Sequence, residues 1–143
     1  MLINTYTHSL DAKGRVFMPA KFREELGEKI IISQGIGGCL FVFSESGWLD
    51  FAGKLRQIPM TDAKAQGFLR VLFASACECE PDKQGRVLLP QRLRDFAGMT
   101  NEVVANGVMT RVELWSKDGW DAYLANASEG YDEALEKLAE FGI

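Results

Sequence analysis

The 143-residue chain contains an internal repeat, and this repeat limits its possible folds more than any other feature. At an offset of 71 residues, positions 11–16 (DAKGRV) align with positions 82–87 (DKQGRV). Pro19, Arg23 and Gly27 then fall on a proline, an arginine and a glycine at the same offset. Seven of the seventeen positions 11–27 are identical, where average composition would give roughly one. The fold must therefore use one supersecondary unit twice.

The match continues at an offset of 72 after one extra residue in the second copy. Gly35 then falls on Gly107, and Trp48 falls on Trp120. We assign the copies to residues 5–47 and 76–119, with a helical insert at 48–75 and an acidic tail at 120–143. Each copy is about 45 residues long.

Each copy predicts a β-hairpin, a short helix and a second β-hairpin. Strands at 5–10 and 76–80 lead into an Asp-x-x-Gly turn, and strands at 16–18 and 87–89 return from it. A proline then starts a helix at 20–26 or 91–97, and a glycine ends it. The second hairpin is predicted at 29–33 with 40–43, and at 102–105 with 112–115.

A unit of this size buries too little apolar surface to be stable alone. We therefore expect the copies to share one core about a pseudo-twofold axis, with exchange of strands as one way to do so. The insert predicts two helices around Pro59, the second at 62–74. The tail predicts helix at 120–125 and 129–141. The predicted fold class is α+β, with a mainly β core flanked by helices.

The net charge of −4 argues against a polyanionic partner only if the charge is evenly spread. Residues 113–143 carry eight acids and two bases, so the first 112 residues have a net charge of +2. Residues 11–23 and 82–94 each carry four bases against one acid. These bases are Lys13, Arg15, Lys21 and Arg23 in the first copy, and Lys83, Arg86, Arg92 and Arg94 in the second. Related by a pseudo-twofold axis, they would form one basic face of the kind that binds duplex DNA.

A structural interpretation competes with this one. Arg15 could pair with Asp11, and Arg86 with Asp82, across their own turns. The two roles can coexist, because a carboxylate can orient an arginine toward a ligand. The four basic residues on the short helices could instead be solvated surface charges.

The chain carries two Asp-x-x-x-Arg motifs, each followed at matched offsets by a proline and an arginine, and a Trp ends each copy. This combination resembles the bacterial MraZ family of tandem SpoVT-AbrB-type proteins. The segments at 15–23, 77–82 and 112–115 resemble this family too, and the resemblance covers residues 1–123. It implies an AbrB-like, barrel-like core of swapped hairpins from both copies. The motif positions are Asp11, Gly14, Asp82 and Gly85. Residues 105–108 are more polar than the aliphatic strand expected there. The tail beyond residue 123 varies within the family, so the resemblance implies nothing about its structure or role.

The resemblance also implies a function. Members of the family are cytoplasmic, nucleoid-associated transcriptional regulators that act on the promoter of the division and cell-wall gene cluster. They assemble as closed homo-oligomeric rings and bind short direct repeats in double-stranded DNA. Carried over to this sequence, the DNA-contacting residues would be Arg15 and Arg86. No cofactor and no small-molecule substrate is implied.

Other classes of function fit the sequence less well. His8 is the only histidine, and Cys77-x-Cys79 has no second cysteine pair, so neither an enzyme nor a metal site is indicated. An AbrB-type antitoxin usually has one copy and a disordered tail, whereas this chain has two copies and a helix-prone tail. A ring-forming scaffold that does not bind DNA stays open. The apolar runs are too short for a membrane span.

Overall fold

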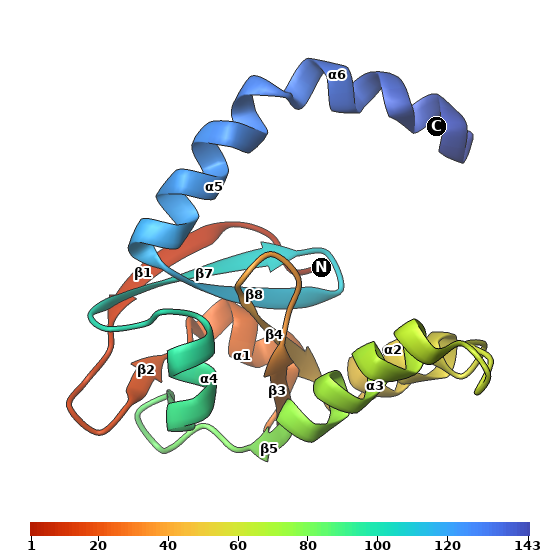
Figure 1. The fold of residues 1–143 in the computed structure, drawn as a ribbon. Coiled ribbons are helices and arrows are strands. Elements are labelled where there is room, and N and C mark those ends of the chain that lie inside the picture. The colour runs from red at the N-terminus through yellow and green to blue at the C-terminus, as the bar shows by residue number, and fades with distance from the viewer.

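The strands of the two copies pair with each other in the computed structural model, which describes all 143 residues (Figure 1). Six of them form one antiparallel sheet in the order β1-β7-β8-β4-β3-β5. The six are β1 (Thr5–Ser9), β3 (Ile30–Gln34), β4 (Leu40–Ser44), β5 (Cys77–Cys79), β7 (Glu102–Val108) and β8 (Arg111–Ser116). Strand β1 of the first copy pairs with β7 of the second, and β5 of the second copy pairs with β3 of the first. The expected α+β class and the exchange of strands are confirmed.

The remaining strands, β2 (Arg15–Phe17) and β6 (Arg86–Leu88), form a two-stranded antiparallel ribbon. Its register is Arg15 to Leu88, Val16 to Val87, and Phe17 to Arg86. Exchanging the copies turns the first of these pairs into the third and returns the middle pair to itself. The pseudo-twofold axis therefore passes between the two valines.

In each copy, the two strands on either side of the Asp-x-x-Gly turn do not pair with each other, so the predicted first hairpin is wrong. Its turn forms, because the Asp11 N–H donates to the Arg15 carbonyl (2.9 Å) and the Asp82 N–H donates to the Arg86 carbonyl (2.9 Å). Beyond the turn, each strand pairs with the other copy instead. This pairing satisfies the same backbone groups and also places the apolar faces of both copies in one core.

The main core lies between one face of the sheet and a layer made of the ribbon, α1 (Ala20–Leu26) and α4 (Gln91–Phe96). Matched positions of both copies meet there. Its fully buried side chains include Met18, Phe22, Ile30, Ile32, Leu40, Val87, Leu89, Leu93 and Leu114. A proline precedes each helix, as the sequence predicts, and Gly27 follows α1 with a φ of +80°.

The other face of the sheet carries an aromatic cluster. Phe41, Phe43 and Trp115 are buried there beneath Trp48 of α2 (Glu45–Leu55) and Trp120 of α5 (Lys117–Glu129). Each helix starts at a serine cap, Ser44 or Ser116, whose hydroxyl accepts the N–H of the glycine three residues later at 3.0 Å. These caps start both helices three residues before the tryptophans, earlier than the sequence predicts.

The two copies differ beyond the ends of these helices. Helix α2 is followed by a turn at Pro59 and by α3 (Ala63–Ser75), which lies beside it and projects from the body (Figure 1). Helix α5 instead continues into α6 (Tyr131–Glu136) and the short 3-10 helix η1 (Lys137–Phe141), which extend away from the sheet. No helix of the structure is long and apolar enough to cross a bilayer.

The strand register corrects one match made from the sequence. Gly107 lies opposite Val112, whereas Gln34 lies opposite Leu40, so Gln34 rather than Gly35 is the counterpart of Gly107. A Cβ atom at position 107 would clash with the backbone nitrogen of Ile3. The glycine is required there because the N-terminal segment passes directly over the strand.

Candidate nucleic-acid interface

The Asp-x-x-Gly-Arg turn of the first copy is held together by its aspartate. Oδ1 of Asp11 accepts the backbone N–H groups of Lys13 (2.9 Å) and Arg15 (2.8 Å). Oδ2 accepts Nε–H of the Arg15 side chain at 2.8 Å. One carboxylate therefore closes the turn and also orients the guanidinium group.

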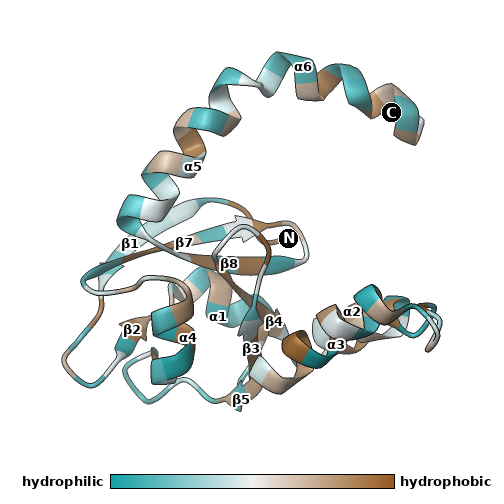
Figure 2. Ribbon diagram, in the orientation of Figure 1, coloured by the Kyte–Doolittle hydropathy of each residue, from teal (hydrophilic) through white to brown (hydrophobic).

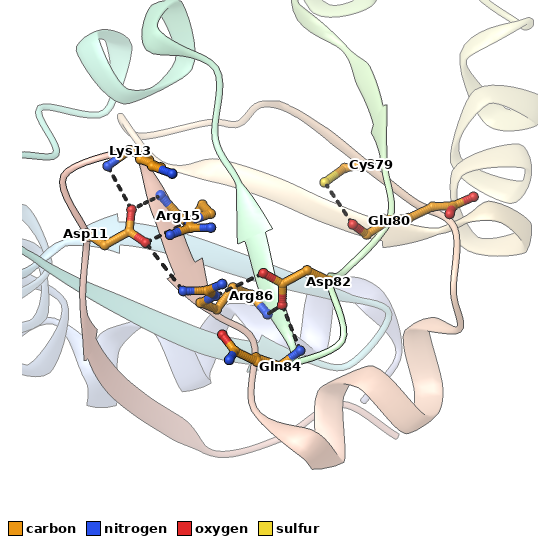
Figure 3. Close-up of polar contacts among 8 residues, drawn as sticks. All are labelled: Asp11, Lys13, Arg15, Cys79, Glu80, Asp82, Gln84 and Arg86. Atoms are coloured by element: carbon orange, nitrogen blue, oxygen red, sulfur yellow. Dashed lines mark hydrogen bonds and ion pairs between the residues drawn. The ribbon is translucent and has the colours of Figure 1, made fainter.

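The second turn repeats this geometry. Oδ1 of Asp82 accepts the N–H groups of Gln84 and Arg86, both at 2.9 Å, and Oδ2 accepts Nε–H of Arg86 at 2.9 Å. The turns also touch, because Nη1 of Arg86 lies 3.9 Å from Oδ2 of Asp11 (Figure 3). Of the guanidinium nitrogens of both arginines, only Nε donates a hydrogen bond within the chain, so the terminal amino groups can still donate to a ligand.

The same contacts keep both aspartates ionised. The backbone N–H of Arg15 lowers the pKa of Asp11 below its usual value of 3.8, although desolvation acts in the opposite direction. The arginine side chain lowers this pKa further. Arg86 lowers the pKa of Asp82 in the same way. At neutral pH both carboxylates are therefore anions that hold cationic side chains in place.

Alternation along the ribbon places both arginines on its outer face. Val16 and Val87 point into the core, so Arg15 and Phe17 of β2 and Arg86 and Leu88 of β6 point outward. The Leu88 side chain is 54 % exposed. Neither apolar residue was predicted from the sequence as part of this face, although the period-two pattern of Arg-Val-Phe and Arg-Val-Leu contains the signal.

The helix arginines Arg23 and Arg94 support the turns from behind. Nε of Arg94 donates to the Leu89 carbonyl at 2.9 Å, and its guanidinium group lies against Gly14 of the other copy, where a Cβ would be 2.6 Å from Cζ. Arg23 lies against Gly85 in the same way, at 2.7 Å. Each of these turn positions therefore requires glycine for two reasons. The backbone has a positive φ (+84° at Gly14 and +83° at Gly85), and the arginine of the other copy lies where a Cβ would be.

The other predicted basic residues divide into two pairs. Lys13 and Lys83 are exposed on the turns and form no ion pair within the chain. Lys21 lies in a groove beside Glu24 and Glu25, whereas Nη2 of Arg92 donates to the Ser75 carbonyl at the end of α3 (3.2 Å). The structure thus gathers six of the eight predicted cations at the turns and directs the last two toward other parts of the chain.

The residues considered for a metal site lie far apart. His8 is in β1 and the cysteine pair is in β5, at opposite edges of the six-stranded sheet. His8 packs against the Phe17 ring, with a centroid distance of 5.0 Å. Cys77 and Cys79 pack against the main core, and burial raises the pKa of both thiols. No group of three or more histidine, cysteine or acidic side chains is arranged to hold a metal ion.

Comparison with known proteins covers the whole chain. A family model described as "MraZ protein, putative antitoxin-like" matches residues 1–71 and again residues 72–141. A protein of Carboxydothermus hydrogenoformans named Transcriptional regulator MraZ is 50 % identical over 141 residues, which is 99 % of each chain. Proteins with the same name from Caldicellulosiruptor saccharolyticus and Moorella thermoacetica are 49 % and 47 % identical over the full length of both chains.

Proposed function

The chain belongs to the MraZ family of transcriptional regulators, and on this premise we propose that it binds double-stranded DNA through its paired Asp–Arg turns. The observation that carries the proposal is the outer face of the ribbon. Two arginines are fixed there through Nε, and their terminal amino groups donate no hydrogen bond within the chain. A transcriptional regulator is not a class of enzyme, and the proposal requires no catalytic group.

The ribbon has the shape and the chemistry to read a major groove. A two-stranded β-ribbon fits this groove, and the terminal amino groups of arginine can donate to O6 and N7 of guanine. Arg15 and Arg86 lie diagonally across the ribbon, and both guanidinium groups lie near Oδ2 of Asp11, so they would reach neighbouring bases. Phe17 and Leu88, on the other diagonal, offer apolar contacts for thymine methyl groups.

Phosphate contacts would come from the surrounding basic residues. Lys13 and Lys83 flank the ribbon on the turns themselves and are the first candidates. Of the four predicted helix residues, we assign weaker phosphate contacts to Arg23 and Arg94, which lie behind the turns. We assign none to Lys21 and Arg92, which are directed toward other parts of the chain. Such contacts position a protein on duplex DNA without reading its sequence.

One ribbon covers only a few base pairs, so we propose that affinity comes from assembly. In a closed homo-oligomeric ring, neighbouring copies would engage successive direct repeats in the promoter DNA, and the linked contacts would reinforce one another. In keeping with the family resemblance, we place the protein in the cytoplasm, at the nucleoid, on the promoter of the division and cell-wall gene cluster.

The test removes both arginines at once. The double variant Arg15→Ala with Arg86→Ala is expected to keep its circular dichroism spectrum and its assembly state and to lose binding to the upstream direct repeats. Each arginine–guanine pair contributes about 1–3 kcal/mol of discrimination. A matched control, Lys29→Ala with Lys137→Ala, removes two cations outside the ribbon and should bind with nearly normal affinity. A folded arginine variant that binds the repeats at wild-type affinity would refute the proposal and favour a scaffold that does not bind DNA.

A further inference from the structure

The outer face of the ribbon consists of two cross-strand rows. Arg15 lies directly opposite Leu88, and Arg86 lies directly opposite Phe17. We call these pairs the Leu88 row and the Phe17 row. Each strand gives one residue to each row, and Figure 2 shows hydrophilic and hydrophobic residues together in β2. Exchanging the copies turns one row into the other, so the rows differ only in their apolar residue.

The pseudo-twofold axis of the ribbon points toward the ligand. In an antiparallel pair this axis is perpendicular to the plane of the strands, so it runs from the core out through the face that carries both arginines. Twofold symmetry in a DNA-binding protein is matched by a palindromic site. A ribbon with two identical rows would therefore bind a palindrome and would fit it equally well in both directions.

In the Phe17 row the apolar side chain is partly covered by its own copy. The His8 ring packs against the Phe17 ring edge to face, with a centroid distance of 5.0 Å. Cζ of Arg23 lies 5.3 Å from the centre of the same ring. Phe17 is half-buried as a result. These contacts hold the ring in place and leave only part of it open to a ligand.

In the Leu88 row the apolar side chain is more open. At the position equivalent to His8 the second copy has Cys79, whose thiol lies 3.9 Å from the carbonyl oxygen of Leu88. Arg94, the equivalent of Arg23, lies over no aromatic ring. The Leu88 side chain is 54 % exposed, so its methyl groups are accessible from the outer face.

We propose that the two rows read different bases, so that the ribbon binds a non-palindromic site in one direction, and that Phe17 and Leu88 determine this direction. The inference rests on the proposed DNA binding. In the Leu88 row, the leucine packs on the 5-methyl group of a thymine beside the guanine that Arg15 contacts. The partly covered Phe17 ring makes a smaller contact, and its row prefers thymine less.

The first experiment removes single methyl groups from the DNA. Within one repeat of the upstream duplex, each thymine in turn is replaced by deoxyuridine, which keeps the base pair and lacks the 5-methyl group. At one position the wild-type protein should lose affinity about fourfold. Leu88→Ala should lose nothing more from that replacement, whereas Phe17→Leu should keep the fourfold loss. Binding that no replacement weakens would overturn this inference alone, whereas a protein that binds no duplex would refute the proposed function.

The second experiment makes the two rows identical. The protein selects sites from a pool of random duplexes, and the wild type should enrich a site that differs from its own reverse complement. Phe17→Leu and Leu88→Phe each give two equal rows and should enrich nearly palindromic sites. The exchange variant Phe17→Leu with Leu88→Phe again has one row of each kind and should enrich the wild-type site. All variants should keep the circular dichroism spectrum.

The turns supply a matched control, because they differ in the position of their lysine. Ala12→Lys with Lys13→Gln makes the first turn identical in sequence to the second. Phosphate contacts carry no sequence information, so this variant should still enrich the wild-type, non-palindromic site. A palindromic site from the wild-type protein would overturn the inference. Wild-type sites from both single-row variants would overturn it too, as would a palindrome from the turn variant.

Discussion

The two repeats of this molecule are alike at their Asp–Arg turns and unlike in their helical flanks. The carboxylate contacts of Asp11 span 2.8–2.9 Å, and those of Asp82 are all 2.9 Å. By contrast, α3 returns along α2, whereas α6 continues away from α5. The shared geometry builds one two-sided ribbon, and the unlike flanks give the chain two different ends. A nearly symmetric ribbon and two unlike helical flanks thus coexist in one chain.

The two copies also differ at the pseudo-twofold axis between β4 and β8. Phe41 and Glu113 are equivalent positions of the two copies, and they lie directly opposite each other. The buried Glu113 carboxylate accepts Nε–H (3.0 Å) and Nη2–H (2.7 Å) of Arg111 and Nε1–H of Trp115 (3.2 Å). The Arg111 guanidinium in turn lies 4.8 Å from the centre of the Phe41 ring. In a dimer of identical units each position would face itself, so only a tandem chain can build this pair.

The largest expected effect tests whether the repeats share one core. Phe22 and Leu93 are equivalent and almost fully buried, so Phe22→Ala should cost about 3–5 kcal/mol and Leu93→Ala about 2–5 kcal/mol of unfolding free energy. Because both side chains lie in the same cluster, each variant should unfold in a single transition. Urea denaturation followed by circular dichroism and by tryptophan fluorescence measures this. Two separate transitions would show that the repeats fold independently.

Much of this fold can be predicted from the repeat, but not which strands pair. The Asp-x-x-Gly turns, the proline-started helices and α3 appear where the sequence predicts them, because local backbone preferences determine them. The pairing of β2 with β6 depends on contacts about 70 residues apart, which no local pattern records. The same limit applies to the interface. Arg15 and Arg86 are apparent from the motif, whereas the cross-copy contacts of Arg23 and Arg94 with the turn glycines follow only from the exchange of strands.

The next effect concerns the turn glycines. Gly14→Ala and Gly85→Ala should each cost about 1–2 kcal/mol of stability, because an alanine at positive φ is strained. Each variant should also displace the arginine of the other copy and weaken DNA binding. Gly98→Ala is the matched control, since its φ is +64° and nothing lies within 4 Å of the added carbon. It should lose stability without losing affinity. Unequal losses of affinity for Gly14→Ala and Gly85→Ala would show that one turn dominates the interface.

A smaller effect compares the two turn lysines. Lys13→Ala and Lys83→Ala should each reduce the slope of log affinity against log salt concentration by about 0.9, as expected when one phosphate contact is lost. Binding titrations at several salt concentrations, with one duplex, measure this slope. Lys29→Ala should leave it unchanged, because Lys29 lies beside Glu45 and Glu78, away from the ribbon. If only one lysine variant changes the slope, the two repeats do not contact the backbone equally.

The smallest effect is the acid response of the two turn aspartates. Their pKa values lie below 3.8 in the folded protein, so the stability they contribute is present above that pH. It is lost as the pH falls through the depressed pKa values. Asp11→Asn and Asp82→Asn should therefore each lower the unfolding free energy at neutral pH by similar amounts. The difference from the wild-type protein should shrink steadily below about pH 4. Urea denaturation over a pH series measures both variants. A difference that persists unchanged in acid would mean that the shape of the aspartate, rather than its charge, holds the turn.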